Sequence, residues 1–230
     1  MTAKAHVFVG DPEQPVVDDA DRHHLARVLR LRPGDEVTVS DGAGRWRLCR
    51  WTGGAVEPTG DPVTEPAPAR ALTVAFALTK GERPEWVVQK LTELGIDRIV
   101  AFRAERSVVR WTPDRAAAQV ERWRRIAREA ASQSRRVWLP VVEDVTAFAD
   151  LLARPGAVLA SADGGPPSPD HGVVLIGPEG GWSDAELAEA SAAGVPRVAL
   201  GPHILRAETA ATTAGALLAA LRAGLVSPQS

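Results

Sequence analysis

Near the C-terminus, three side chains that can take part in polar chemistry lie within one turn of chain: Arg206, Glu208 and Thr209. They follow an exposed apolar pair, Ile204 and Leu205. A guanidinium can stabilise a developing anion, and a carboxylate beside it can accept a proton. The stretch lies between a short apolar strand pattern and a helical pattern. We therefore expect it at the carboxyl end of a sheet, where open α/β sheets bind ligands.

A second candidate loop lies at residues 174–183, which run as strand, glycine loop and capped helix. Glycines let a ligand approach backbone N–H groups, and a helix N-terminus adds positive potential. No lysine follows the glycines, so this is not a P-loop, and the spacing of a dinucleotide fingerprint is absent. A plain tight turn explains this loop alone equally well. Glycine loops at 163–165 and 200–202, one strand earlier and one later, favour a shared ligand site.

Other chemistries have little support. The adjacent histidines 23–24 cannot share one face, and no cysteine or aspartate lies at ligand spacing, so we expect no metal site. Ser161, Asp163 and His171 lack the nucleophile elbow of a hydrolase. The single cysteine, Cys49, lies in an alternating strand pattern and is expected to be a small core residue.

Basic charge is clustered and is almost entirely arginine, at 24 of the 27 basic residues. Residues 22–32 and 122–136 hold most of the clustering, although the net charge is −2. Arginine makes bidentate phosphate contacts and stacks on bases. A GC-rich genome explains the arginine content, and the stripe in the second cluster is equally a solvent-facing helix surface. Together with Arg106, the two clusters could form an RNA phosphate track.

The elements that must position these residues fall into two parts. Residues 1 to about 57 read as a small barrel or sheet module, with a hairpin signal at 41–44 between alternating runs. Residues 18–31 have a helical pattern, with Leu25, Val28 and Leu29 on one face. Four prolines in residues 58–68 indicate a linker that cannot lie inside a sheet or helix.

The domain boundary is expected near residue 70, giving domains 1–69 and 70–230. After it, strand patterns alternate with helical ones, which predicts a mostly parallel sheet. Strands are expected at 72–78, 98–102, 157–161, 173–176 and 197–200. Helices are expected at 84–94 and 116–134, and a further one begins at Asp184, because Ser183 and Glu186 have capping-box spacing.

Length and composition set the broad class. A chain of 230 residues with 45% hydrophobic residues suits one large domain or two small ones with an ample core. No apolar run approaches the length of a membrane span, and the start lacks the apolar core of a secretion signal. One cysteine excludes an internal disulfide framework, so a cytoplasmic location is expected.

Several motifs together carry a family resemblance over nearly the whole chain. They are residues 24–30, 41–44, 89–95, 105–107, 130–134, 176–181 and 200–210. With these motifs in this order, the chain resembles the bacterial family that methylates N3 of a uridine in 16S ribosomal RNA of the small subunit. That family lies within the SPOUT class of S-adenosyl-L-methionine-dependent RNA methyltransferases. Trp182 stands where the family usually has phenylalanine.

The resemblance implies an α/β SPOUT methyltransferase domain with a C-terminal trefoil knot, preceded by a small PUA-like β-barrel domain that grips RNA. It also implies a homodimer. The strand and helix pattern by itself predicts an ordinary doubly wound sheet, because knots are rare.

The resemblance also implies that S-adenosyl-L-methionine lies among three loops. The expected cofactor-binding residues are Ala160, Ile176, Gly177, Pro178, Glu179, Gly180, Gly181, Leu200, Gly201, Ile204, Leu205, Arg206, Thr209 and Ala210. The expected RNA-binding residues are Arg22, Arg27, Arg30, Lys90, Arg106 and Arg136.

The expected catalytic residues are Arg206 and Glu208. N3 of uridine carries a proton that must leave, and Arg206 would stabilise the resulting anion. Glu208 either accepts the proton or is an N-cap or first-turn carboxylate favoured by the helix dipole, and both interpretations stay open. The target base must be unpaired or flipped, because N3 lies on its Watson–Crick edge. A methyltransferase with another RNA target, a non-catalytic RNA-binding assembly factor and a nucleotide-binding enzyme are the alternatives.

Overall fold

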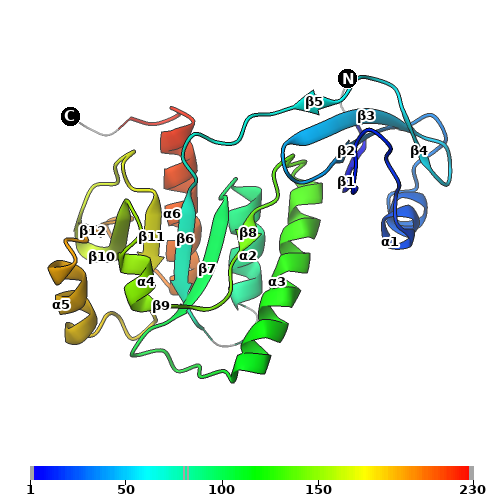
Figure 1. Ribbon diagram of the computed structural model, residues 1–230. Coiled ribbons are helices and arrows are strands. Elements are labelled where there is room, and N and C mark those ends of the chain that lie inside the picture. Colours follow the sequence, from blue (N-terminus) through cyan, green and yellow to red (C-terminus); the bar gives the residue numbers. More distant parts are fainter. Residues whose placement is uncertain (1–2, 80, 82, 228–230) are drawn as a thin grey trace. The chain divides into compact units, whose positions relative to one another are not determined.

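The computed structural model describes residues 3–79, 81 and 83–227, which form two compact units (Figure 1). The first consists of residues 1–69 with 128–139, and the second of residues 70–127 with 140–230. The sequence predicted one boundary near residue 70. The structure differs, because residues 128–139 also belong to the first unit. This return to the first unit has a local cause: the Arg128 guanidinium donates to the carbonyl oxygen of Phe8 at 2.9 Å and lies 5.1 Å from the centre of its ring.

A five-stranded sheet forms the first unit, where the sequence predicted a small barrel or sheet module. The strands pair in the order β1-β2-β3-β4, with β5 beside β3. β1 and β2 are parallel, and the other pairings are antiparallel. The bounds are β1 Ala5–Phe8, β2 Glu36–Ser40, β3 Arg45–Trp51, β4 Val56–Pro58 and β5 Val63–Thr64.

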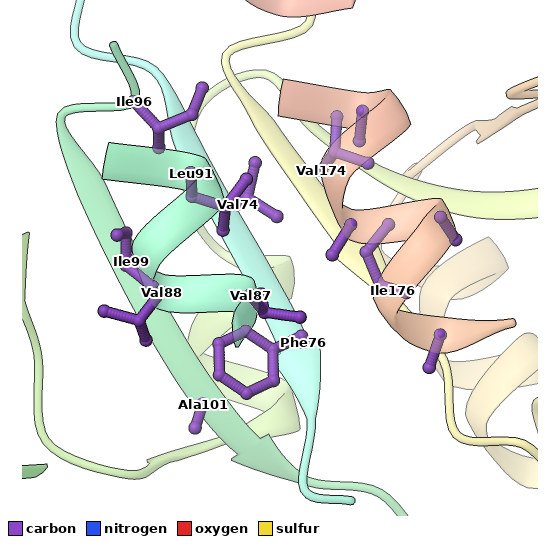
Figure 2. Packing of buried hydrophobic residues seen from close by; sticks show 14 of the residues in the cluster. Val74, Phe76, Val87, Val88, Leu91, Ile96, Ile99, Ala101, Val174 and Ile176 are labelled. Atoms are coloured by element: carbon purple, nitrogen blue, oxygen red, sulfur yellow. The ribbon is translucent and has the colours of Figure 1, made fainter. Parts of the chain in front are cut away.

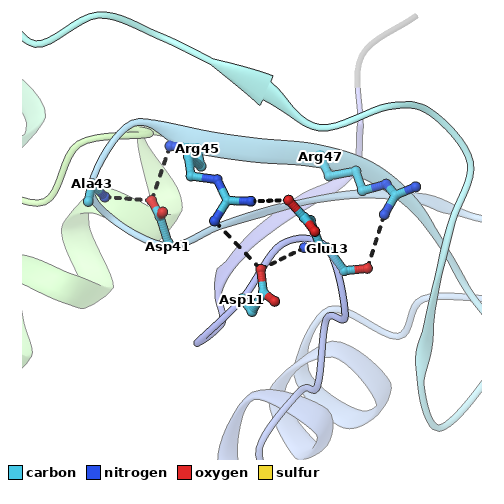
Figure 3. Close-up of polar contacts among 6 residues, drawn as sticks. All are labelled: Asp11, Glu13, Asp41, Ala43, Arg45 and Arg47. Atoms are coloured by element: carbon cyan, nitrogen blue, oxygen red, sulfur yellow. Dashed lines mark hydrogen bonds and ion pairs between the residues drawn. The ribbon is translucent and has the colours of Figure 1, made fainter.

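The predicted hairpin between β2 and β3 is confirmed. The Asp41 carboxylate accepts the backbone N–H groups of Ala43 at 2.7 Å and Arg45 at 3.1 Å, which closes the turn (Figure 3). The Arg45 side chain then donates to Glu13, whose backbone carbonyl accepts from Arg47 (Figure 3). These contacts fasten the segment after β1 to the hairpin.

The predicted helix at 18–31 is shorter and less regular than expected. α1 (Asp19–His23) is followed directly by a π-helical turn, η1 (His24–Val28). Leu25 is buried, but Val28 is 60% and Leu29 43% exposed, so the prediction of one apolar face is wrong for these two. The reason is the wider π turn, which places more residues in each turn than the α-helical spacing assumes.

The proline-rich segment is mostly exposed, but it is not wholly outside the sheet. Pro58 ends β4, which pairs only with β3. An edge strand accepts a proline because one side of the strand has no ladder partner. The expectation that no proline of this segment lies in a sheet is therefore wrong for Pro58.

The second unit is built on a fully parallel sheet, as predicted. Its order is β12-β10-β11-β6-β7-β8, with β9 beside β7. The strands are β6 Thr73–Ala77, β7 Arg98–Arg103, β8 Val141–Val142, β9 Thr146–Ala147, β10 Ala157–Gly165, β11 Val173–Ile176 and β12 Arg197–Val198. The helices are α2 Arg83–Glu93, α3 Pro113–Gln133, α4 Phe148–Leu152, α5 Asp184–Ala192 and α6 Ala207–Arg222.

Side chains alternate along the strands between two buried clusters, so both faces of the sheet are covered. Val74 and Phe76 of β6 face the cluster formed with α2, α3 and α6. Figure 2 shows them beside Val87, Val88 and Leu91 of α2. Ala75 and Ala77 face the cluster formed with α4 and α5. No helix among the described residues is long and apolar enough to cross a bilayer.

His6 is a titratable group in the core of the first unit. It is 5% exposed, and its Nδ1 lies 2.8 Å from the Thr38 hydroxyl. Burial, together with the nearby Arg135 guanidinium, lowers the pKa of His6 from 6.5 to about 4. The folded protein therefore keeps this imidazole neutral at pH values where the unfolded chain protonates it.

We expect the stability of the first unit to fall as the pH drops from 6.5 toward about 4, because only the unfolded chain takes up the proton in this window. The loss is on the order of 3 kcal/mol. Urea unfolding followed by tryptophan fluorescence at pH 7.5 to 4.5 measures it. His6→Gln should flatten the pH dependence, whereas His23→Gln, at an exposed position, should not. An equally steep dependence in His6→Gln would contradict this assignment.

Candidate functional site

The loops that follow three neighbouring strands meet at one edge of the parallel sheet. β10 lies between β11 and β12, and all three run in the same direction. The carboxyl ends of parallel strands lie at the same edge, so these loops and the start of α6 converge there. This is the edge at which the sequence predicted a ligand site.

A cavity of about 780 Å³ opens between β10, the loops after β11 and β12, and the start of α6. The glycine loop predicted at 163–165 is wrong, because these residues lie inside β10, and they do not line the cavity. The cavity is lined by most of the predicted cofactor residues: Ala160, Ile176, Gly177, Pro178, Glu179, Gly181, Leu200, Gly201, Ile204, Leu205, Arg206 and Ala210. Gly180 and Thr209 are outside the lining. Gly180 packs against Arg106, and Thr209 is an exposed residue of α6.

Several lining residues were missed by the sequence reasoning, above all Trp182. Its indole N–H donates to the carbonyl oxygen of Ala160 at 2.9 Å, and its ring is stacked on Phe102. A Cβ at Gly177 would lie 2.9 Å from the Trp182 ring, so a larger residue there would push the indole away. Trp182 thus joins the loop after β11 to the middle of β10. The sequence signal that could have identified Trp182 is its position directly after two glycines.

The loop after β11 is shaped by its turn and by the cap of α5. The N–H of Gly181, which has a φ of 71°, donates to the Pro178 carbonyl at 2.8 Å. Ser183 and Glu186 form the predicted capping box, which is confirmed. The second carboxylate oxygen of Glu186 accepts the backbone N–H of Glu105 at 2.9 Å. The loop is therefore held from both ends.

The two predicted catalytic residues differ in their surroundings. Arg206 is exposed, lines the cavity and has no ion-pair partner among the described residues. Glu208 lies in the first turn of α6, whose N-cap residue is Arg206. Glu208 is therefore a first-turn residue and not the N-cap, and it is not among the residues that line the cavity. Its role as proton acceptor stays a prediction. One of its carboxylate oxygens, Oε2, is buried without a hydrogen-bond partner in the part of the chain that the structure describes.

Arg83 of α2 also lines the cavity and was not among the predicted residues. Its guanidinium forms an ion pair with Glu179, and its Nε lies 3.9 Å from Oε1 of Glu208. The sequence offered one signal. A cation near the N-terminal end of a helix opposes the helix dipole, so an arginine there needs an anionic partner.

The predicted RNA-binding arginines of the first unit are not equivalent. Arg22 donates to Asp19 and to the carbonyl oxygens of Gly54 and Val17, so it supports the local fold. Arg27 and Arg30 are exposed, and neither has an ion-pair partner among the described residues. These two are the ones free to contact phosphate.

In the second unit, Lys90 is paired with Glu93 at 2.8 Å, and Arg106 donates to the Gly180 carbonyl at 3.2 Å. Arg106 therefore supports a predicted cofactor loop. Arg136, which groups with the first unit, is half-buried just after α3 and donates its N–H to the Ala131 carbonyl at 2.9 Å. A role of these three residues in RNA binding stays a prediction.

Within the described part of the chain, the other candidate side chains do not assemble a competing site. Cys49 is fully buried, and burial raises the pKa of its thiol to about 11, so the expectation of a core residue is confirmed. Ser161 donates to Asp163, whereas the His171 ring accepts the N–H of Ser168. Among the described residues there is no cluster of three metal-ligand side chains.

The cavity fits the cofactor expected from the resemblance. Its volume lies in the usual range of small-molecule sites, about 300–1,000 Å³. Ile176, Leu205 and Ala210 offer apolar surface, whereas the loops at Gly177 and Gly201 offer backbone polar groups without side chains. Apolar walls with a few backbone donors suit a planar nucleoside with polar edges.

Comparison with known families matches residues 65–219 to the RNA methyltransferase domain and residues 17–53 to the RNA methyltransferase PUA domain. The ribosomal RNA small subunit methyltransferase E of Synechocystis sp. is 35% identical over 94% of this chain and 78% of its own length. The Mycobacterium tuberculosis protein of the same name is 34% identical over 86% of this chain and 83% of its own length.

Two solved structures that contain S-adenosylmethionine are similar over nearly the whole chain. One is a putative methyltransferase of Legionella pneumophila, with a TM-score of 0.82 and 26% identity over 96% of this chain and 98% of that one. The other, a ribosomal RNA small subunit methyltransferase E of Neisseria gonorrhoeae, has a TM-score of 0.79 and 28% identity over 94% and 97%. The expected fold class is confirmed, and the knot stays a prediction.

A substitution at Gly164 tests how closely β10 and β12 must approach each other. A Cβ there would lie 2.5 Å from the backbone nitrogen and 2.6 Å from the Cα of Val198. We expect Gly164→Ala to force the strands apart, to destabilise the protein by about 1–3 kcal/mol and to weaken cofactor binding. Gly165→Ala is the matched control, because nothing lies within 4 Å of its added Cβ. Thermal unfolding and calorimetry measure both effects, and equal behaviour of the two variants would contradict the prediction.

Proposed function

The chain belongs to the RNA methyltransferase family, and on that premise we propose that it transfers a methyl group from S-adenosyl-L-methionine to N3 of a uridine in 16S ribosomal RNA. The observation that carries the proposal is the cavity of three loops with an unpaired arginine, Arg206, in its wall. A free guanidinium is available for a substrate because no carboxylate of the described residues neutralises it.

The loops around Ala160, Gly177 and Leu200 would hold the cofactor largely through backbone groups. The cofactor supplies an electrophilic methyl group on a sulfonium. The protein supplies orientation, which brings two reactants into line, and electrostatic stabilisation of the uracil anion. Arg206, in the cavity wall, would stabilise this anion. Glu208 lies within the same turn of chain and is the candidate acceptor for the N3 proton.

The first unit is proposed to grip the RNA. Arg27 and Arg30 are exposed and lie beside exposed Val28 and Leu29, so guanidinium groups and apolar surface occur together. Such a surface suits phosphates and unstacked bases of an irregular RNA segment.

We also propose that the protein is cytoplasmic, acts on the small ribosomal subunit or its RNA, and forms a homodimer. Ile204 supports the dimer, since this apolar side chain at the cavity is 94% exposed in the single chain. A second copy placed over the cavity would remove it from water.

Arg206→Ala should slow single-turnover methylation of 16S RNA by about 10²–10³-fold, because the charge that stabilises the uracil anion is lost. The dissociation constant of S-adenosyl-L-methionine should change little, since the cofactor is held by backbone groups. Rapid-quench kinetics and calorimetry separate the two effects. Arg115→Ala, an exposed arginine outside the cavity, is the control. A turnover rate equal to that of the unmodified protein would rule out the assignment.

Exchanging Arg27 and Arg30 together for glutamate should weaken RNA binding and make its salt dependence less steep. Each lost phosphate contact should reduce the slope of log K against log salt by about 0.7–0.9. Arg110→Glu with Arg115→Glu changes the net charge equally at exposed positions of the second unit. The proposal requires the first pair to change the slope more than the second, and filter binding at several salt concentrations measures it.

A further inference from the structure

Arg83 lies at a position where the helix dipole of α2 disfavours a positive charge. It stands near the N-terminal end of α2, and a helix N-terminus carries partial positive charge. The same guanidinium lines the cavity. A cation in this position must obtain its stabilisation from elsewhere in the fold.

Two carboxylates from distant segments provide that stabilisation. Arg83 forms an ion pair through Nη1 with Glu179, in the loop after β11, and its Nε lies 3.9 Å from Oε1 of Glu208. Glu208 comes from the first turn of α6. One planar guanidinium has donors on several edges, so it can serve two carboxylates at once.

Glu208 depends more on this cation than Glu179 does. The Glu208 side chain is 19% exposed and that of Glu179 is 56% exposed. Oε2 of Glu208 is buried and has no hydrogen-bond partner among the described residues. Without Arg83, neither Glu179 nor Glu208 would have an ion-pair partner among the described residues.

We infer that Arg83 is a positioning residue for methyl transfer: it holds the loop of Glu179 against the first turn of α6 and fixes the orientation of the Glu208 carboxylate, which lies behind the cavity wall. The catalytic part of this inference rests on the proposed function. A purely structural role is the alternative. Ion pairs this exposed contribute little to stability, so removing Arg83 should leave the unfolding temperature nearly unchanged.

A double-mutant cycle between Arg83→Gln and Glu208→Gln tests the inference through the single-turnover methylation rate of 16S RNA at saturating cofactor. Arg83→Gln alone should slow the reaction by about 10-fold to 100-fold, as expected when a reacting group is misplaced. Combined with Glu208→Gln it should add almost nothing, because the two residues act as one unit. Arg83→Lys keeps the charge but loses the planar donors, so it should recover only part of the rate.

Arg98→Gln is the matched control, because Arg98 lies outside both arginine clusters. It forms an ion pair of similar exposure with Glu143 at 3.2 Å, and neither residue lines the cavity. We expect its rate and unfolding temperature to equal those of the unmodified protein. A rate of Arg83→Gln within twofold of the unmodified protein, or a fully additive loss in the double variant, would overturn the inference.

Calorimetric titration with S-adenosyl-L-methionine provides a second arm that needs no turnover. If Arg83 acts on the loop through Glu179, Arg83→Gln and Glu179→Gln should each weaken cofactor binding by about tenfold, and together no more than either alone. Unchanged affinity in Arg83→Gln would refute the action on this loop. If the unmodified protein transfers no methyl group to 16S RNA, the proposed function fails, and this arm still decides whether Arg83 positions the loop.

Discussion

The parallel pairing of β10 with β11 on one side and β12 on the other is the interaction on which the candidate site depends. It places three loops at one edge of the sheet, and the helices that bury both faces keep that edge in place. Two details maintain the close fit. Gly164 lets β10 approach the backbone of Val198, and Trp182 donates to Ala160 across the loops. The geometry of the candidate site is therefore a consequence of strand packing.

Several carboxylates of the second unit form ion pairs with arginines from distant segments. Glu143 accepts from both Arg98 and Arg154, and the resulting ion pairs hold strand ends and loops together. At the cavity, by contrast, the described residues leave the Arg206 guanidinium unpaired. Glu208 has one carboxylate oxygen buried without a partner. Groups left incomplete by the fold are those that a substrate can complete.

The first unit shows that identical residue types can have opposite roles. Arg22 is engaged with backbone carbonyls, and Arg128 lies over Phe8, so both support the fold. Arg27 and Arg30 follow Arg22 by only a few residues but are exposed at the π turn and just after it. The path of the backbone separates structural arginines from those available to RNA. The arginine-rich composition alone does not make this distinction.

The sequence by itself determined several local features: the longer strands, the capping box at Ser183, the glycine loops at 177–181 and 200–202 and the order of two modules, because each depends on neighbours a few residues apart. The glycine loop predicted at 163–165 is wrong, because those residues extend β10. The family resemblance, read from the sequence motifs, located most of the residues that line the cavity. Only the tertiary structure revealed the contact of Arg83 with Glu179 and Glu208, the indole bond of Trp182 and the return of residues 128–139 to the first unit. These contacts join segments far apart in the chain, and no local periodicity encodes which distant side chains will meet.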